Sequence, residues 1–300
     1  MIDLHIHTTY SDGTDSLVEL LNNANKKDLK VISITDHDDV SVYKELDNLN
    51  IDRYYKGRII SGCEFTTSFY DRLIEVLGYG FDYKKIDEYL NSFYTNEFMI
   101  SSRMTLYNRL VSILKEYNLK YDNEVIENAI KDKFYLITIY NELIKYPVNK
   151  DILNEDLFNS YSDFIRKGIY NKNSKLFLNH AEFKPKIEEI INIIHLSGGI
   201  CFLAHPFQYK FNDTEEFLNR IYNETSLDGI ECFYTMFTNE QTEYIKDFAK
   251  ERNLLISGGS DYHGKNKQNH HLGIGKGNLN IREDILKNYN ITYYKWLKIW

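Results

Sequence analysis

The sequence of 300 residues predicts an α/β protein built on a mainly parallel sheet or barrel, with a helical insertion. Short apolar segments with strand character alternate with amphipathic segments of helical period, which is the pattern of right-handed βαβ units. Ionisable residues gather at the carboxyl ends of the strand-like segments. Residues 81–167 contain no glycine, although the whole chain has 15, and this stretch separates two strand-rich parts.

The first expected strand is formed by residues 1–7, MIDLHIH. Apolar residues at the even positions alternate with Asp3, His5 and His7, the period-2 pattern of a strand, so both histidines project to the same side. Residues 16–29 then have the period of an amphipathic helix, and Ser16 with Glu19 matches a capping box at its start. The chain therefore begins with a strand, a loop and a helix.

Six further strands are expected along the chain, in residues 30–38, 58–65, 73–80, 198–206, 227–234 and 254–264. Helices are expected at 185–197 and 239–253. The polar residues near the ends of the strands are His7, Asp36, His37, Glu64, His205, Glu231, Asp261 and His263. Active sites of barrels and of open α/β sheets are built at that edge, so we expect these side chains to lie close together.

The insertion is expected to be helical. Residues 96–118, 123–133 and 134–146 have helical spacing of their apolar side chains, and Pro147 ends the last of them. We predict a helical insertion domain over residues 82–178, between the two parts of a barrel domain formed by residues 1–81 and 179–300.

Composition excludes several classes of protein. Forty-four acidic residues against 36 basic ones give a net charge of −8, which argues against an extended nucleic-acid-binding surface. The three cysteines have no CxxC spacing and are expected to be buried in a reducing compartment. Because no apolar run approaches 18 residues and no secretory leader pattern is present, we expect a cytoplasmic protein with no membrane association.

The motif His-X-His at residues 5–7 lets two imidazoles reach one divalent ion from the same face of a strand. Alone it is weak evidence and fits an exposed polar strand face better than a metal site. The segments TDHD, GCE, AHP and SDYH add imidazoles and carboxylates at other strand ends, and together they favour a metal site. The motifs GxSxG and GxxxxGK[ST] are absent from the sequence, so we expect no protein nucleophile.

These motifs resemble the PHP (polymerase and histidinol phosphatase) family of metal-dependent phosphoesterases. DLHIHTTYSDG, ISITDHDDV, GCE, LGYG, GGICFLAHP, LDGIECFYTMFT and GGSDYHG occur in the family's order and span nearly the whole chain. RMTLYNRL in the insertion is similar to the bacterial subgroup that acts on nucleotide 3′,5′-bisphosphates and RNA 5′ ends. The resemblance implies a distorted (β/α)7 barrel with two or three divalent ions, of Mn, Fe or Zn with Mg also possible, at the strand ends.

The resemblance also implies which residues bind these ions. The ligands of one ion would be His5, His7, Glu64 and Asp261, and Glu64 would bridge to a second ion that His205 also binds. Those of a third would be Asp12, His37 and His263. Before LGYG the family usually has a histidine on the second ion, whereas this chain has Glu75, and a carboxylate shifts the preference toward harder ions.

Other residues are expected around the ligands. Asp36 and Asp3 are interpreted as hydrogen-bond partners of metal-bound groups, with direct ligation by Asp36 the alternative. Arg103 of the insertion either binds a substrate phosphate or lies on a solvated helix face, and the latter is the better interpretation of Arg109. Glu231 and Tyr234 either line the pocket or cap the sheet. Four histidines without a matched motif are expected outside the site: His180, His195, His270 and His271.

The reaction expected from this site is hydrolysis of a phosphate ester of a nucleotide or short RNA end by metal-bound hydroxide. Two alternatives are histidinol-phosphate phosphatase and a non-catalytic PHP accessory module. The spacing of the motifs does not separate monoesterase from diesterase action, because pocket shape decides between them.

Overall fold

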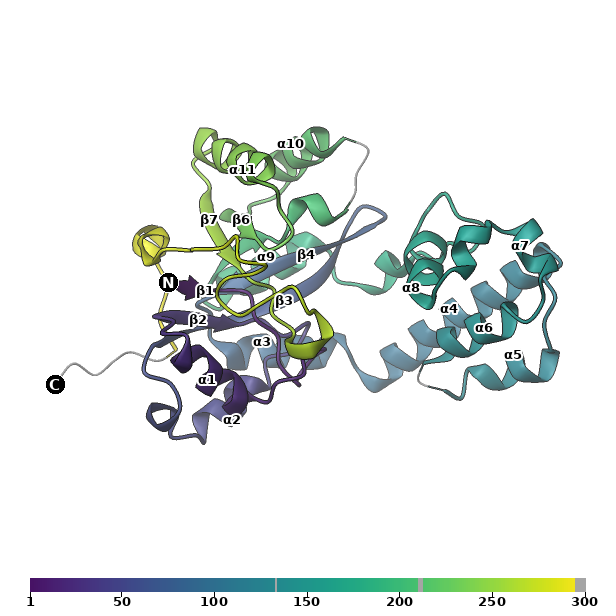
Figure 1. The fold of residues 1–300 in the computed structure, drawn as a ribbon, viewed down its shortest axis with the longest axis horizontal. Coiled ribbons are helices and arrows are strands. Elements are labelled where there is room, and N and C mark those ends of the chain that lie inside the picture. The colour runs from purple at the N-terminus through teal and green to yellow at the C-terminus, as the bar shows by residue number, and fades with distance from the viewer. Residues whose placement is uncertain (133, 210–212, 295–300) are drawn as a thin grey trace. The chain divides into compact units, whose positions relative to one another are not determined.

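The computed structural model describes residues 1–132, 134–209 and 213–294 of the chain. These residues form two compact units. The first contains Met1–Phe69, Leu73–Phe93 and the described part of Pro185–Trp300, and the second contains Tyr70–Arg72 and Tyr94–Lys184. Figure 1 shows strands and helices in the first unit and helices in the second.

A seven-stranded sheet forms the first unit, with its strands adjacent in the order of the chain. They are β1 (Ile2–Asp3), β2 (Val31–Ile34), β3 (Arg58–Phe69), β4 (Arg72–Tyr79), β5 (Ile200–Leu203), β6 (Gly229–Tyr234) and β7 (Leu255–Gly259). Strands β1, β2 and β3 pair in parallel, as do β5, β6 and β7, whereas β4 runs antiparallel to β5.

The sheet closes on itself between β7 and β1. The backbone N–H of Leu4 donates to the carbonyl of Gly258 at 3.2 Å, and that of His7 donates to the carbonyl of Tyr262 at 2.8 Å. The parallel strands therefore end at the rim of a distorted barrel, and the predicted α/β barrel fold is confirmed.

Helices of the first unit connect the strands. They are α1 (Leu17–Lys26), α2 (Val42–Asp47), α3 (Tyr83–Phe93), α9 (Ile187–Leu196), α10 (Thr214–Glu224) and α11 (Asn239–Glu251). Helix α1 begins with the predicted capping box, since Ser16 Oγ accepts from the backbone of Glu19 and the Glu19 carboxylate accepts from the backbone of Ser16.

An apolar cluster fills the part of the barrel that lies near the amino ends of the strands. Its buried members come from several strands and from the C-terminal segment: Ile2, Leu4, Val31, Ile60, Leu77, Tyr79, Phe202, Ala204, Leu279, Ile281, Leu286 and Tyr289. The backbone of Ile2 donates to the carbonyl of Ile281, and the Tyr289 hydroxyl donates to the carbonyl of Ile256. The C-terminal segment thus closes this end of the core, and the polar residues lie at the other end.

The second unit is helical and has a core of its own. Its helices are α4 (Asn96–Glu116), α5 (Asn123–Ala129), α6 (Tyr135–Leu143), α7 (Val148–Ile152) and α8 (Tyr161–Asp163). Leu110, Leu114, Ile139, Leu143 and Phe164 are completely buried in its core. The main segment of the second unit begins at residue 94 instead of the predicted residue 82, because α3 packs against α9 of the first unit. It ends at residue 184, and the predicted end was residue 178.

Within the described residues, the structure has no helix long and apolar enough to cross a membrane.

Candidate metal centre

The candidate metal centre lies at the carboxyl ends of the barrel strands. His5 and His7 follow β1, His37 follows β2, Glu64 and Glu75 lie within β3 and β4, and His205 and Asp261 follow β5 and β7. In overlapping groups of three or four of these side chains, the ligand atoms lie within 4.8 Å of one another. All nine predicted metal ligands belong to these groups, so the fold brings them to one place.

Glu64 occupies the middle of the centre and is 1 % exposed. Its Oε2 atom lies 3.1 Å from Nε2 of His5, 3.1 Å from Nε2 of His7 and 3.3 Å from Nδ1 of His37. Its Oε1 atom lies 2.8 Å from Nε2 of His205. The two carboxylate oxygens therefore face different imidazoles, which is the arrangement of a bridging ligand.

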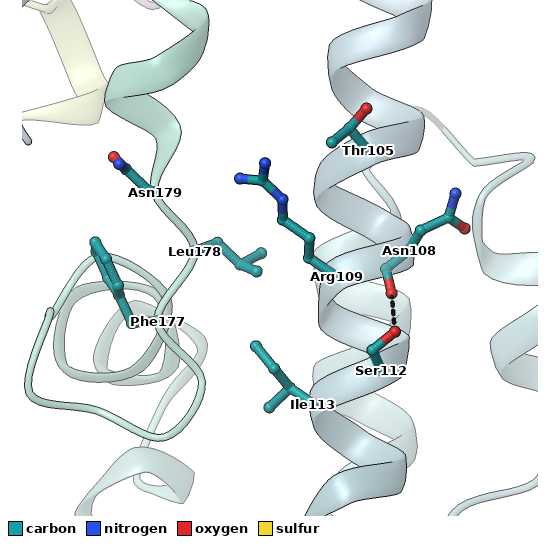
Figure 2. Close-up of a pocket in the computed structure, with 8 residues that line it drawn as sticks. All are labelled: Thr105, Asn108, Arg109, Ser112, Ile113, Phe177, Leu178 and Asn179. Carbon is teal, nitrogen blue, oxygen red and sulfur yellow. Dashed lines mark hydrogen bonds between the residues drawn. The ribbon is translucent and has the colours of Figure 1, made fainter.

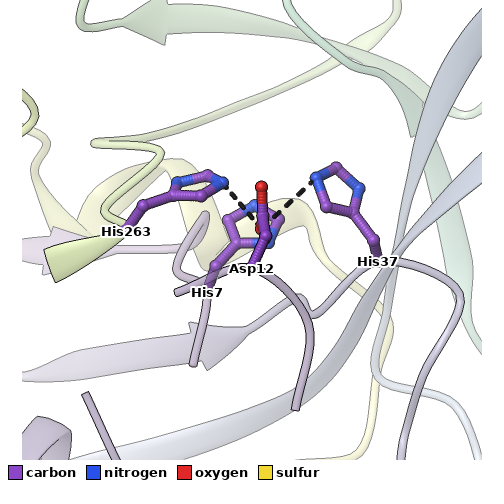
Figure 3. Close-up of side chains that lie close together, drawn as sticks. All are labelled: His7, Asp12, His37 and His263. Carbon is purple, nitrogen blue, oxygen red and sulfur yellow. Dashed lines mark ion pairs between the residues drawn. The ribbon is translucent and has the colours of Figure 1, made fainter. Parts of the chain in front are cut away.

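Asp12 brings three histidines together on the side of the centre nearer to solvent. Its Oδ1 atom lies 3.0 Å from Nε2 of His263 and 3.8 Å from both Nδ1 of His7 and Nε2 of His37. Figure 3 shows the His263 and His37 rings on opposite sides of Asp12, with the His7 ring beside it. The Asp12 side chain is 56 % exposed, so this group is accessible to an ion or a substrate.

Glu75 faces the same centre from β4. Its Oε2 atom lies 3.4 Å from Nε2 of His205, and its Oε1 atom lies 3.9 Å from Nδ1 of His37. The ligand atoms of His37, Glu64 and Glu75 form one of the close groups. The Glu75 carboxylate therefore lies beside His205 and His37, where the resemblance would lead one to expect a histidine.

Unsatisfied nitrogen atoms indicate that this centre fits a metal. Nε2 of His7, Nδ1 of His37, Nδ1 of His205 and Nε2 of His263 are buried without a hydrogen-bond partner. Three of them lie within 3.4 Å of a carboxylate oxygen, but without the geometry of a hydrogen bond. Buried polar groups without partners are costly, and an ion between these three nitrogen atoms and the carboxylates that face them would satisfy them.

The two carboxylate oxygens of Asp261 have different contacts. Oδ2 accepts hydrogen bonds from the Tyr234 hydroxyl at 2.8 Å and from Lys267 Nζ at 2.7 Å. Oδ1 lies 3.4 Å from Nε2 of His7 and 3.6 Å from Nε2 of His5. One oxygen is held in place by the protein, and the other is available to a metal.

Glu231 orients two ligands and is completely buried. Its Oε1 atom lies 2.9 Å from Nδ1 of His5, and its Oε2 atom accepts from the backbone N–H of His205 at 2.8 Å. The bond to Nδ1 leaves Nε2 of His5 to face Glu64, as expected for a carboxylate behind a metal-bound histidine. The sequence offered Glu231 and Tyr234 either as residues that line the pocket or as caps of the sheet. In the structure Glu231 contacts His5 and His205, and the Tyr234 hydroxyl donates to Asp261.

Among the hydrogen bonds of the described residues, Asp36 and Asp3 accept from backbone and hydroxyl groups and from no imidazole ring. Asp36 accepts from the backbone and hydroxyl of Thr8 at 2.7 and 2.6 Å, and from the Ser11 hydroxyl at 2.6 Å. Ser11 in turn lies 3.4 Å from Nδ1 of His7. Asp3 accepts from the backbone and hydroxyl of Ser260 at 2.9 and 2.6 Å, and so fixes the segment that leads to Asp261.

The arginines of the helical unit contact groups of that unit. Arg103 donates to the carbonyls of Ile130 and Asp132, and its guanidinium lies 5.8 Å from the centre of the Tyr135 ring. Arg109 pairs with Glu182 at 2.9 Å and lines a groove between α4 and residues 177–179, which Figure 2 shows. The role of Arg103 in substrate binding stays a prediction.

Lys267 is a residue that the sequence analysis missed. It lies in the segment after β7, and its bond to Asp261 brings a cation to the edge of the centre. Its side chain is 38 % exposed. The segment GKNKQNHH offered two nearby lysines and no pattern to choose between them, since the sequence there has neither the period of a strand nor that of an α-helix.

The ionisable side chains of the centre shift one another's pKa values. Burial alone would lower the pKa of His7, but the Asp261 and Glu64 carboxylates raise it to about 9. Burial also opposes charge on His205, whose pKa Glu64 raises to about 9. Burial and the neighbouring Glu64 raise the pKa of Glu75 to about 7, whereas His263 and the other histidines overcome desolvation and lower that of Asp12 to about 2.

Comparisons with known proteins identify the family. Residues 3–232 match the model of the PHP domain. The chain is 25 % identical over 276 residues to a 5′-3′ exoribonuclease of Haemophilus influenzae, covering 87 % of this chain and 89 % of that protein. It is 23 % identical over 280 residues to a phosphoribosyl 1,2-cyclic phosphate 1,2-diphosphodiesterase of Eggerthella lenta, covering 91 % of this chain and 97 % of that protein.

Solved structures support the fold. A structure described as a metal-dependent phosphoesterase from Bifidobacterium adolescentis superimposes with a TM-score of 0.62 at 23 % identity, over 96 % of this chain and 94 % of the other. An amidohydrolase from Chromobacterium violaceum gives a TM-score of 0.60 at 20 % identity, over 88 % of each chain. The predicted enzyme class, a metal-dependent hydrolase of phosphoric ester bonds, is confirmed by the family match and the relatives together. As its motifs predicted, the chain belongs to the PHP domain family.

Proposed function

We propose that this protein hydrolyses the phosphate ester of a nucleotide or of the 5′ end of a short RNA, at a cluster of divalent ions. The observation that carries this proposal is the group of four imidazoles around the Glu64 carboxylate, with buried nitrogen atoms that have no hydrogen-bond partner. Burying this many ionisable groups carries a large desolvation cost, which the binding of a divalent ion would offset.

The proposed ions number two or three. The first would be held by His5, His7, Glu64 and Asp261, the second by Glu64, His205 and Glu75, and the third by Asp12, His37 and His263. Mixed imidazole and carboxylate ligands suit Mn, Fe or Zn, and the added carboxylate of Glu75 leaves Mg possible.

Such ions would neutralise the charge of the phosphoryl oxygens and lower the pKa of a coordinated water. The protein contributes orientation: Glu231 fixes the His5 ring, and the Tyr234 hydroxyl fixes Asp261. Lys267 is the residue we assign to the substrate phosphate, because its ammonium group lies at the edge of the centre and is partly open to solvent. No protein nucleophile is required.

Relatives favour a nucleotide-type substrate over histidinol phosphate. The proteins from Haemophilus influenzae and Escherichia coli are named 5′-3′ exoribonucleases, and the latter is 22 % identical over 269 residues. The relative from Eggerthella lenta is named for a cyclic phosphate diester of a ribose. We place the reaction in the cytoplasm.

The proposal is tested with the protein loaded with Mn²⁺. The panel holds a short RNA with a 5′-phosphate, adenosine 3′,5′-bisphosphate, AMP and histidinol phosphate, each with and without EDTA. His263→Ala removes a ligand of the third ion, and His271→Ala is the matched control, because His271 is an exposed histidine outside the centre. Released phosphate and mononucleotide are both measured.

We expect the wild-type protein to turn over the RNA or the nucleotides. This activity should be lost with EDTA and in His263→Ala, and it should be retained in His271→Ala. Preference for histidinol phosphate would keep the metal chemistry and contradict the substrate. Absence of any EDTA-sensitive turnover would favour the accessory-module alternative.

A further inference from the structure

A second group of metal-ligating side chains lies away from the candidate metal centre. His195 is in the last turn of α9, Cys201 is the second residue of β5, and Asp228 directly precedes β6. Cys201 and Asp228 therefore lie at the amino ends of their strands. His205 of the metal centre is four residues farther along the chain than Cys201, which corresponds to roughly 13 Å of extended chain.

We propose that His195, Cys201 and Asp228 form a separate binding site for a divalent cation that is intermediate between hard and soft, such as Zn²⁺. Nε2 of His195, Sγ of Cys201 and a carboxylate oxygen of Asp228 lie within 4.8 Å of one another. Neither the proposed reaction nor its substrate uses these residues, so this site goes beyond the proposed function.

The distances between these atoms are close to those of a tetrahedral zinc site. Sγ of Cys201 lies 3.6 Å from Nε2 of His195 and 3.3 Å from Oδ2 of Asp228. Metal–ligand bonds of about 2.3 Å to sulfur and about 2.1 Å to nitrogen and oxygen imply tetrahedral edges of about 3.4 to 3.6 Å. The distance of 2.8 Å between Nε2 of His195 and Oδ2 of Asp228 is a hydrogen bond, which the ion would open by about 0.6 Å.

Backbone contacts hold two of the ligands in place before any ion binds. The backbone N–H of Cys201 donates to Oδ2 of Asp228 at 2.8 Å, and the backbone N–H of Asp228 donates to the carbonyl of Cys201 at 3.0 Å. This reciprocal pair joins the starts of two neighbouring strands. Only the His195 side chain, at the end of a helix, would adjust to the ion.

Accessibility and ligand chemistry identify the class of cation. The side chains of His195 and Asp228 are 36 % and 29 % exposed, so an ion can reach the site and keep a water as its fourth ligand. A thiolate with an imidazole and a carboxylate favours Zn²⁺ over Mg²⁺ or Ca²⁺, which take oxygen ligands. Cys201 is a free and buried cysteine, and its thiol proton would leave on binding.

Co²⁺ is the probe for this site, because a thiolate bound to Co²⁺ gives an intense near-ultraviolet charge-transfer band. The metal centre of the barrel contains no cysteine among its candidate ligands, so it cannot contribute to that band. Co²⁺ is titrated into the full-length protein, and into variants Cys201→Ser and His195→Gln. Cys232→Ser is the control, since Cys232 is a second buried free cysteine whose sulfur contacts only the carbonyl of Ile230 among the hydrogen bonds of the described residues.

We expect the band in the wild type and in Cys232→Ser once Co²⁺ exceeds the two or three equivalents that the barrel metal centre can take up, and its loss in both Cys201→Ser and His195→Gln at the same excess. Zn²⁺ added afterward should displace Co²⁺ and abolish the band. If Cys201→Ser fails to fold, His195→Gln decides the outcome. The His195 side chain is partly exposed, so its replacement should leave the fold intact. No band in the wild type, a band that persists in either ligand variant, or loss of the band in Cys232→Ser would overturn the proposal.

Discussion

The Glu64 carboxylate is the residue on which the candidate centre depends most. It is buried, and its two oxygens face the rings of His5, His7, His37 and His205. Despite desolvation, these imidazoles hold the pKa of Glu64 well below its usual range, so it is a carboxylate at neutral pH. A buried anion among imidazoles is the feature that would attract divalent ions to this position.

Glu64→Gln keeps the size of the side chain and removes its charge. We expect at least about 100-fold weaker binding of Mn²⁺ and a matching loss of turnover, since even partners of metal ligands cost 10–100-fold when mutated. Isothermal titration calorimetry with Mn²⁺ measures the first effect. Glu215→Gln, on an exposed position of α10, is the control, and unchanged affinity in Glu64→Gln would contradict the bridging role.

Lys267 is predicted to act on the substrate phosphate. Lys267→Met should lower kcat/KM at least about tenfold, equivalent to about 1.4 kcal/mol of transition-state stabilisation, while the number of bound ions stays unchanged. Lys265→Met is the matched control, because Lys265 is an exposed lysine of the same segment. Loss of bound metal in Lys267→Met would instead assign to Lys267 the task of positioning Asp261.

The pH dependence of metal binding follows from the raised pKa values of His7 and His205. Both pKa values are about 9 without metal, so at pH 7 these imidazoles carry protons that an ion must displace. The apparent affinity for Mn²⁺ should therefore increase as the pH rises from 7 to 9. Calorimetry in buffers of different ionisation enthalpy measures the released protons, and an affinity independent of pH would contradict this assignment.

At the scale of elements, the ends of β5 and β7 place ligands through unusual backbone conformations. His205 and Asp261 follow these strands with φ angles of 23° and 54°, in the region that favours glycine. Such conformations cost of order 1–3 kcal/mol and are common at functional sites. Here they accompany the contacts of His205 with Glu64 and of Asp261 with His7.

Close packing of β7 against β1 leads to a prediction at this scale. A Cβ atom added at Gly259 would collide with the backbone nitrogen and Cβ of His5, and would lie 2.8 Å from Oδ1 of Asp3. Gly259→Ala should therefore shift β1, with a cost of roughly 1–3 kcal/mol and weaker metal binding. Gly168→Ala is the control, because the nearest atoms to its added Cβ lie at 3.7 Å. Chemical denaturation and Mn²⁺ titration of both variants measure the difference.

For the whole molecule, metal binding and stability should be linked. An ion that binds the folded centre and not the unfolded chain stabilises the folded state by about 2.7 kcal/mol at 100 times its Kd. Mn²⁺ should then raise the Tm by roughly 5–10 °C, given the size of the barrel unit. Differential scanning calorimetry with Mn²⁺ and then EDTA tests this, and an unchanged Tm would contradict a site completed by metal.

Local patterns of the sequence predicted the strands and their places along the chain, and the motifs at the strand ends predicted the candidate ligands. Period-2 alternation around His5 and His7 is a local property of the chain, and so is the capping box of Ser16 and Glu19. Parallel strands end at one edge, so the polar residues that follow them in the sequence had to meet. Helices α4, α5 and α6 of the second unit were predicted from the spacing of their apolar residues, whereas α7 and α8 were not.

Tertiary structure alone decided the roles of residues whose partners are distant in the sequence. Glu231 orients His5 from 226 residues away, and Lys267 reaches Asp261 from a loop without periodic pattern. The packing of α3 against α9 places that helix with the barrel unit. His195, Cys201 and Asp228 share no motif and meet only because a helix end adjoins two strand starts. Local patterns specify which elements form, whereas contacts between elements arise only when the chain has closed into its barrel.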